Sequence, residues 1–261
     1  MRPYLALAKV TARSALAFRL QYALSLLGVL FQLTAMLAVW HALLAGRTLG
    51  GFTWPKMQDY LLVAFAAGAL VSNLSDFRIS FKIRNGLVAL DLVKPIDYQT
   101  ARFAETVGTL WVEIASTALV WLGAIALGVR LSPPSACAAV LFPISMLLLV
   151  LLKFAVTYLT GLICFWTKNY LGLYWARLAV VSLLSGALVP LSLLPHWLST
   201  TAQWLPFAGM TSTPGLILIG NAVGWTAARL VAVQLVWAVV LYYGARLAWQ
   251  GAVRQLTIHG G

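Results

Sequence analysis

Two charged residues lie inside long apolar segments of the sequence, where a charge is costly and therefore informative. Glu113 falls within the apolar segment 103–128 and Lys153 within the segment 136–165. If the two segments cross a membrane in opposite directions, both side chains lie about 15–18 Å from the same face, at 1.5 Å of rise per residue. An unpaired charge at mid-bilayer costs about 2.5–3.5 kcal/mol on insertion scales. The spacing predicts an interhelical Glu113–Lys153 pair or shared polar site, which either fixes helix packing or contacts a substrate.

Signatures of catalysis are missing from the sequence. It contains no G-x-x-x-x-G-K-[ST] phosphate loop and no H-E-x-x-H, C-x-x-C or G-x-S-x-G motif. Cys137 and Cys164 fall in different positions of the apolar region and have no metal-ligand spacing to a histidine. We therefore expect no catalytic residue, no metal site and no cofactor in this chain, and an intramembrane enzyme is the weakest interpretation.

The composition is that of an integral membrane protein. The 261 residues are 62% hydrophobic and 9% charged, and the mean hydropathy is +0.90. Soluble domains carry about 25% charged residues, so this chain could not cover a globular surface. The net charge of +12 does not indicate nucleic acid, because no stretch is long enough to build a basic face. It is better explained by membrane topology and by contact with anionic lipid head groups.

The apolar segments predict an all-α membrane domain that spans residues 1–261. A bilayer core of about 30 Å needs about 20 apolar residues per helix. By that measure six transmembrane helices are expected, at 20–44, 58–77, 103–128, 136–165, 170–192 and 226–249. With these spans, thirteen Lys and Arg residues fall on one side and four on the other. The asymmetry predicts a multi-pass membrane protein with both termini in the cytoplasm.

Two further segments flank these spans. Residues 4–19 place Lys9 and Arg13 on one face with apolar residues elsewhere, which predicts an amphipathic helix in the inner interface; the alternative is a cytoplasmic extension of the first span. Residues 193–225 are apolar yet broken by proline, which predicts short re-entrant helices on the external side; the alternative is a hydrophobic loop packed on the outer ends of the spans. The prolines and tryptophans that define this second segment are Pro195, Trp197, Trp204 and Pro206.

The stretch 78–95 predicts a helix, a break and a second helix between two spans. The four-residue spacings in 78–84 indicate a short amphipathic helix. Asn85 and Gly86 tolerate the left-handed conformation that ends a helix, and an apolar run then continues until Pro95 closes it. Such a segment exposes a hydrophobic knob with a basic collar, suited to a groove in a soluble partner. The alternative is a turn that rests on lipid head groups.

At this point the sequence resembles the permeases of type-2 ABC exporters, and most closely their small all-membrane subgroup. The layout agrees along nearly the whole chain. The inner loop of that subgroup reads Gly-x-Leu-x-x-x-Leu-x-x-Pro or similar, and Gly86, Leu92 and Pro95 keep this frame. The segment "LPHWLSTTAQWLPF" also looks like the external segment of the subgroup. One departure is Leu87, which stands where the subgroup usually has an acidic residue.

The resemblance implies a role for each segment. Residues 82–95 would be the coupling helix in a cleft of a separate ATPase, the N-terminal helix would be the connecting helix, and the external segment would gate the route. It also implies two ATPase chains that hold ATP and Mg, and a second permease chain, identical or homologous. The exported substrate would be hydrophobic or amphipathic, such as a lipid-linked molecule, drug or peptide. The residues expected to couple to the ATPase are Lys82, Ile83, Arg84, Asn85, Gly86, Leu87, Leu90, Leu92 and Pro95.

Two other functions compete with this one. An ion-coupled secondary transporter would use an ionisable group on the transport path, and Glu113 is the main candidate. That class usually shows internal repeats, and none is convincing here. A membrane scaffold without transport activity is the third possibility, although it gives the broken external segment no purpose.

Overall fold

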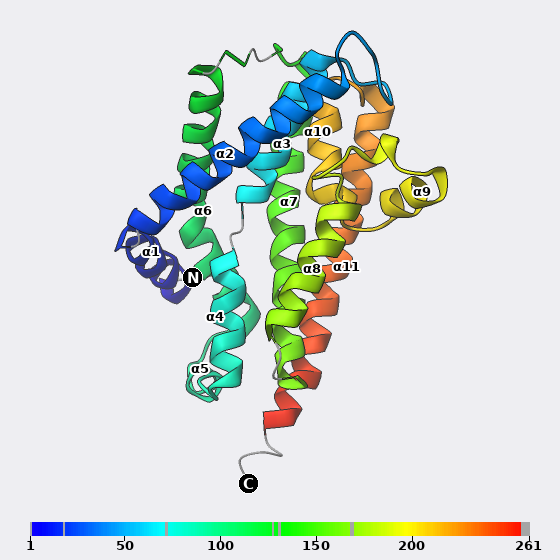
Figure 1. Cartoon of the computed structure of the whole chain (residues 1–261). Coiled ribbons are helices and arrows are strands. Elements are labelled where there is room, and N and C mark those ends of the chain that lie inside the picture. The colour runs from blue at the N-terminus through cyan, green and yellow to red at the C-terminus, as the bar shows by residue number, and fades with distance from the viewer. Residues whose placement is uncertain are drawn as a thin grey trace.

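The fold is a bundle of helices, seen in Figure 1. The computed structural model describes residues 2–17, 19–70, 73–126, 128–129, 132–167 and 170–256. Within these ranges every named element is helical, and the only extended pairing is a bridge between Leu49 and Phe52. In Figure 1 the short helix α5 and the C-terminal end of α11 lie at one end of the bundle. The loop before α3 and the C-terminal end of α6 lie at the other end.

The N-terminal region forms two helices. Helix α1 (Arg2–Ala17) is present where the sequence predicts an amphipathic helix, and α2 (Arg19–Leu43) follows it. Helix α1 crosses α6 closely, because Gly108 of α6 packs directly against the backbone carbonyl of Ala8 and a Cβ there would overlap it. A glycine at this position is what allows the two backbones to approach. Placement of α1 in a membrane interface stays a prediction.

The expected continuous helix 58–77 is wrong. Helix α3 (Trp54–Ala69) ends where Leu70 adopts an extended conformation (φ −70°, ψ 140°), and a separate helix α4 (Asn73–Arg84) begins three residues later. Hydropathy alone suggested one span, but the sequence after Leu70 reads VSNLSD. Ser, Asn and Asp compete with the helix backbone for hydrogen bonds and favour helix ends.

The expected helix 170–192 is also shorter than predicted. Helix α8 (Tyr170–Leu184) has 15 residues, about 22 Å at 1.5 Å per residue. Gly186 then takes a positive φ of 81°, a conformation that favours glycine and ends the helix. Among the residues that the structure describes, four helices are long and apolar enough to cross a membrane, within Tyr22–Leu43, Tyr98–Ala126, Ala136–Phe165 and Gly224–Arg254. Six spans are therefore not confirmed.

The remaining long helices form the scaffold of the bundle. They are α6 (Tyr98–Ala126), α7 (Ala136–Leu162) with the 3-10 turn η1 (Ile163–Phe165), and α11 (Gly224–Leu256). Helices α7 and α11 lie side by side along the bundle in Figure 1. At 33 residues α11 is about 50 Å long, which exceeds a hydrocarbon core of about 30 Å.

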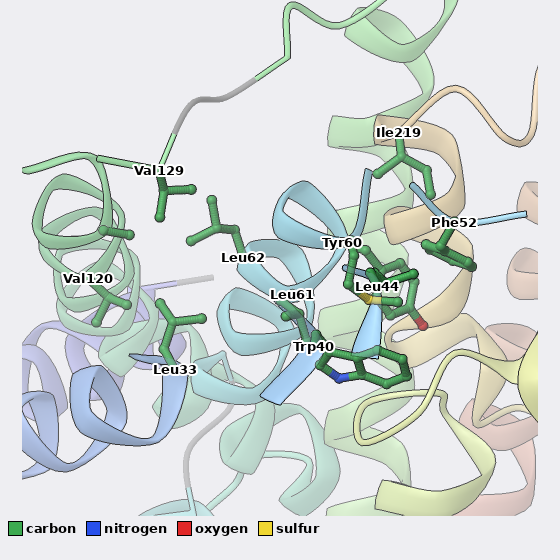
Figure 2. Packing of buried hydrophobic residues seen from close by; sticks show 12 residues of the cluster. Leu33, Trp40, Leu44, Phe52, Tyr60, Leu61, Leu62, Val120, Val129 and Ile219 are labelled. Atoms are coloured by element: carbon green, nitrogen blue, oxygen red, sulfur yellow. The ribbon is translucent and has the colours of Figure 1, made fainter. Parts of the chain in front are cut away.

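The segment before α11 is broken into short helices, as its prolines predict. They are η2 (Leu191–Leu193), α9 (His196–Trp204), η3 (Ala208–Met210) and α10 (Ser212–Leu218). We call residues 193–225 the insert. Beside it lies a buried apolar cluster in which Tyr60 of α3 meets Phe52 edge to face, with 5.3 Å between the ring centroids. Figure 2 shows this cluster, to which Leu44 and Ile219 also belong.

Candidate functional site

The segment between α4 and α6 turns sharply at a glycine. Helix α4 ends at Arg84, and the Asn85 side chain donates a hydrogen bond from Nδ2 to the carbonyl of Phe81 at 2.8 Å. Gly86 takes a positive φ of 68° and donates from its N–H to the carbonyl of Ile83. Helix α5 (Val88–Leu92) follows at once. The local sequence thus forms the expected helix, break and second helix, in which the glycine supplies the left-handed turn.

One side of this turn exposes apolar side chains. Leu90 is 64% exposed and Val93 is 84% exposed, and Leu87 and Leu92 are exposed as well. We call these four residues, Leu87, Leu90, Leu92 and Val93, the apolar knob. Basic side chains stand beside it, since Arg84 and Lys94 are also exposed. These exposed apolar side chains, gathered in one short segment with basic residues beside them, are a candidate surface for interaction.

The opposite side of the segment is buried. Ile79, Ile83 and Val88 belong to one core cluster with Phe154 and Tyr158 of α7. A Cβ on Gly161 of α7 would lie 2.7 Å from Ile79, so the glycine makes room for this packing. Ile83, which the resemblance placed among the coupling residues, therefore faces the bundle. It supports the knob from behind and does not form its surface.

A buried carboxylate gathers the charges of the segment. Asp91 of α5 accepts from Lys82 Nζ at 2.9 Å and from Lys94 Nζ at 2.8 Å, and Arg102 Nη2 of α6 lies 3.3 Å from Asp91 Oδ2. Burial alone would raise the pKa of Asp91, but the hydrogen bonds from Lys94 and Lys82 and the charge of Arg102 outweigh it and lower that pKa. Sequence reasoning missed this group. The available signal was Asp91 itself, the one acidic residue among the cations of 78–95.

Helix α6 connects this charge cluster to α11. Arg102 donates from Nη1 to Glu105 Oε2 at 2.8 Å, and its guanidinium lies 5.0 Å from the ring centroid of Tyr98. Tyr98 stacks on Trp249 of α11, with centroids 4.0 Å apart and an interplanar angle of 2°. Gln99 Nε2 donates to the carbonyl of Tyr242, also on α11, at 3.2 Å. The start of α6 is therefore fixed to both α5 and α11.

The N-terminal helix also reaches this region. The backbone N–H of Asp97, just before α6, donates to the hydroxyl of Tyr4 at 3.0 Å. The Asp97 side chain accepts from the N–H of Thr100 at 2.8 Å and so caps the start of α6. Lys9 and Arg13 on α1 are exposed, as a helix in contact with anionic head groups requires.

The predicted Glu113–Lys153 pair stays a prediction. Glu113 is buried, with 2% of its surface exposed. The described contacts of Lys153 are with backbone: its Nζ donates to the carbonyls of Ala67 at 2.8 Å and Gly68 at 3.1 Å, and also to that of Leu70. A cation at the carbonyl end of a helix is favourable. Lys153 of α7 therefore stabilises the end of α3, where the expected span breaks.

Gln234 makes neutral, buried polar contacts at the insert, whereas Lys56 Nζ donates to Asn221 Oδ1 at 2.6 Å on its exposed side. Gln234 of α11 donates from Nε2 to the carbonyls of Gly209 at 2.7 Å and Ser145 at 2.8 Å, and accepts from Ser145 Oγ at 2.9 Å. Tyr60 donates from its hydroxyl to the carbonyl of Gly186 at 2.8 Å. Of the residues predicted to form a gate, Pro195, Trp197 and Trp204 are exposed and Pro206 is buried.

Within the residues that the structure describes, no group of His, Cys, Asp and Glu gathers that could hold a metal ion.

Comparison with known proteins places the chain in a family. The comparison with curated proteins found no match. The sequence model of a family described as ABC-2 family transporter protein matches residues 29–260, which include α5, the charge cluster and the insert. The match and the long apolar helices identify a transmembrane permease, and the chain belongs to the ABC-2 family of transporter proteins.

Proposed function

We propose that this chain is the permease subunit of an ATP-driven exporter in the bacterial inner membrane, powered by a separate ATPase. The observation that carries the proposal is the apolar knob. Its side chains are exposed at the tip of a turn whose other face is packed and ion-paired against the bundle. A rigid apolar projection fits a cleft in a soluble subunit, because burying exposed apolar surface is the main favourable term in protein association. The family provides such a subunit, an ABC ATPase.

The mechanism we propose is alternating access. Two ATPase chains bind ATP and Mg, close on each other and move the knobs of two permease chains, which are identical or homologous. Both termini then lie in the cytoplasm with the knob, and the insert faces the outside. Arrangement of the elements supports this, since α5 and the C-terminal end of α11 lie at one end of the bundle and the insert lies toward the other (Figure 1).

We propose a hydrophobic or amphipathic substrate, such as a lipid-linked molecule, drug or peptide. The helices offer apolar side chains along most of their length, and exposed ones include Phe31, Leu122 and Val236. A route lined by such side chains selects for apolar character rather than for one molecule.

The test is affinity capture of the tagged chain from its native host in mild detergent, with mass spectrometry of the proteins that remain bound. We expect a stoichiometric ABC ATPase, and recovery of a second permease would show which chains pair. The substitutions Leu90→Ser and Val93→Ser together should remove the ATPase. The matched control is Leu5→Ser with Val10→Ser on α1, which changes equally exposed Leu and Val residues elsewhere.

The outcomes separate the candidate functions. A chain that purifies without any nucleotide-binding protein contradicts the proposal and favours the ion-coupled transporter. In that case Glu113→Gln, which removes the charge of a buried carboxylate, should abolish transport in cells depleted of ATP. Equal loss of the ATPase in both double variants would show that capture depends on membrane assembly and not on the knob.

A further inference from the structure

Helix α5 is too short to hold its own orientation. It has five residues, whereas isolated helices need about 12–15 residues to be even marginally stable in water. Its direction must therefore come from contacts with the rest of the chain. The knob depends on that direction, because Leu90 and Leu92 lie on α5 and Val93 follows it directly.

The inner face of α5 consists of Val88 and Asp91. Residues three positions apart share one side of a helix, and both side chains are buried, with exposed fractions of 0% and 7%. Burial of the valine is non-directional and restrains rotation weakly. Charge-assisted hydrogen bonds have a defined geometry. Asp91 is thus the residue that can set the rotation of α5 and, with it, the direction in which the knob points.

The cations around Asp91 come from three parts of the chain. Lys82 is on α4, Lys94 follows α5 and Arg102 is on α6. Lys94 is 54% exposed and Arg102 is 3% exposed. An exposed ion pair contributes little, whereas breaking a buried pair leaves an uncompensated charge. Arg102 therefore carries more of the restraint than Lys94, although its contact with Asp91 is the longer one.

The Asp91–Arg102 pair is also a direct ionic link from α5 to the long helix α6. Arg102 is braced by Glu105 and Tyr98 on α6, and Tyr98 stacks on Trp249 of α11. The covalent path in the other direction runs up α4, and it is interrupted at Leu70, where the backbone is extended. A continuous helix therefore does not join α4 to α3.

We propose that Asp91 and Arg102 are positioning residues of the coupling interface. Their ion pair holds α5 so that the knob faces the partner, and it carries a displacement of the knob to α6 and α11. This inference rests on the proposed function for its partner, the ATPase. The orientation of α5 can be measured on the permease alone.

Hydrogen–deuterium exchange of the full chain in lipid nanodiscs tests the orientation. We expect Asp91→Asn and Arg102→Met each to raise exchange at residues 88–93 about tenfold or more. Peptides from α7 and α11 should keep their protection. The matched control is Lys94→Gln, which removes an exposed cation from the same carboxylate and should change exchange less than about twofold. The effects of the two substitutions should not add fully in the double variant, because both remove the same Asp91–Arg102 ion pair.

Binding to the captured ATPase tests the coupling role. Asp91→Asn should weaken that binding about tenfold, while peptides from α7 and α11 keep their protection. The control for binding is Arg229→Gln, which removes an exposed cation near the start of α11 and should leave ATPase binding within about twofold. Unchanged exchange at 88–93 in both single variants overturns the positioning role and leaves the proposed function standing. Faster exchange throughout the bundle also overturns it, since the pair would then support the fold in general. A wild-type chain that binds no ATPase overturns the proposed function and the coupling role with it. Asp91→Asn nearly preserves the side-chain volume, so it decides the matter even where Arg102→Met does not fold.

Discussion

The two ends of the bundle hold their short helices by opposite chemistry. At the α5 end, a buried carboxylate on Asp91 meets three cations. At the insert, the buried polar contacts are neutral, with Tyr60 donating to the carbonyl of Gly186 and Gln234 donating to those of Gly209 and Ser145. Residues 193–221 contain no Lys, Arg, Asp or Glu at all.

We attribute the difference to the proposed positions of the two regions, with α5 in water and the insert in contact with the membrane. Ionised groups are expensive within a bilayer, so buried polar contacts there favour amides, hydroxyls and backbone carbonyls. A cluster of charges is stable only where water or a polar partner is near. The contrast supports the proposal that α5 lies outside the membrane. It also separates the contacts that hold the short helices into ion pairs at α5 and neutral hydrogen bonds at the insert. Different substitutions can remove each kind.

Loss of volume at the insert should have the largest effect. Tyr60 is 1% exposed, and its ring packs so closely on α10 that a Cβ on Gly215 would lie 2.7 Å from it. We expect Tyr60→Ala to lower the free energy of unfolding by about 3–5 kcal/mol, measured by SDS titration in mixed micelles. Tyr60→Phe keeps the ring and should cost about 1 kcal/mol for the hydrogen bond to Gly186. Equal losses in the two variants would mean that the hydroxyl, and not the packing, holds the insert.

The C-terminal end of α3 combines a charge with neutral groups, because the Lys153 ammonium donates to backbone carbonyls there. We expect Lys153→Met to cost about 1.5–3 kcal/mol, the range for hydrogen bonds to charged groups. Lys153→Arg should retain most of the stability, since a guanidinium can also donate to several carbonyls. Unfolding of Lys153→Met, Glu113→Gln and the double variant forms a cycle. A coupling energy above about 0.5 kcal/mol would establish the predicted Glu113–Lys153 interaction, and a value near zero would reject it.

Removal of a neutral hydrogen-bonding group tests the insert without changing its charge. Gln234 is 1% exposed and joins α11 to α7 and η3. Gln234→Leu should cost about 1–3 kcal/mol, because the hydroxyl of Ser145 and the carbonyl of Gly209 lose their partner. The control is Gln203→Leu on α9, where the side chain is exposed and donates to Ser199 Oγ at 3.3 Å. A cost as large in Gln203→Leu would contradict the special role of the buried amide.

Features set by local sequence were predictable. Asn85 and Gly86 predicted the turn between α4 and α5, because a left-handed helix end is a property of those residue types. The prolines at 195 and 206 predicted the broken insert for a similar local reason. Hydropathy failed at Leu70 and Gly186, where a helix ends inside an apolar stretch. Hydropathy averaged over a window reports how apolar a stretch is. It does not detect the residues that end a helix within that stretch.

Contacts between distant residues were not predictable from a single sequence. Asp91 and Arg102 lie on different helices, and Tyr60 and Gly186 are 126 residues apart. Periodicity identifies the face of one helix but not the neighbour that covers it. Glu113 and Lys153 were paired by estimated depth alone. The structure gives Lys153 carbonyl partners on α3, and these exist only because that helix ends early.

The smallest effect is expected from a change of pH. It tests whether Asp91 keeps its charge near neutral pH or takes up a proton there. The pKa of Asp91 is lowered from its ordinary value of 3.8, because the bonds from Lys94 and Lys82 and the charge of Arg102 outweigh the effect of burial. A carboxyl group whose pKa is lowered by folding stabilises the fold above its unfolded pKa, and that contribution disappears only as the pH falls through the lower, folded value. Between about pH 8 and about pH 5 Asp91 therefore stays ionised, and exchange at residues 88–93, corrected for the intrinsic chemical rate, should change less than about twofold. A marked rise in exchange within that interval would show that Asp91 takes up a proton there. The cations around Asp91 would then not hold its charge, and the contrast between a charged and a neutral end would fail.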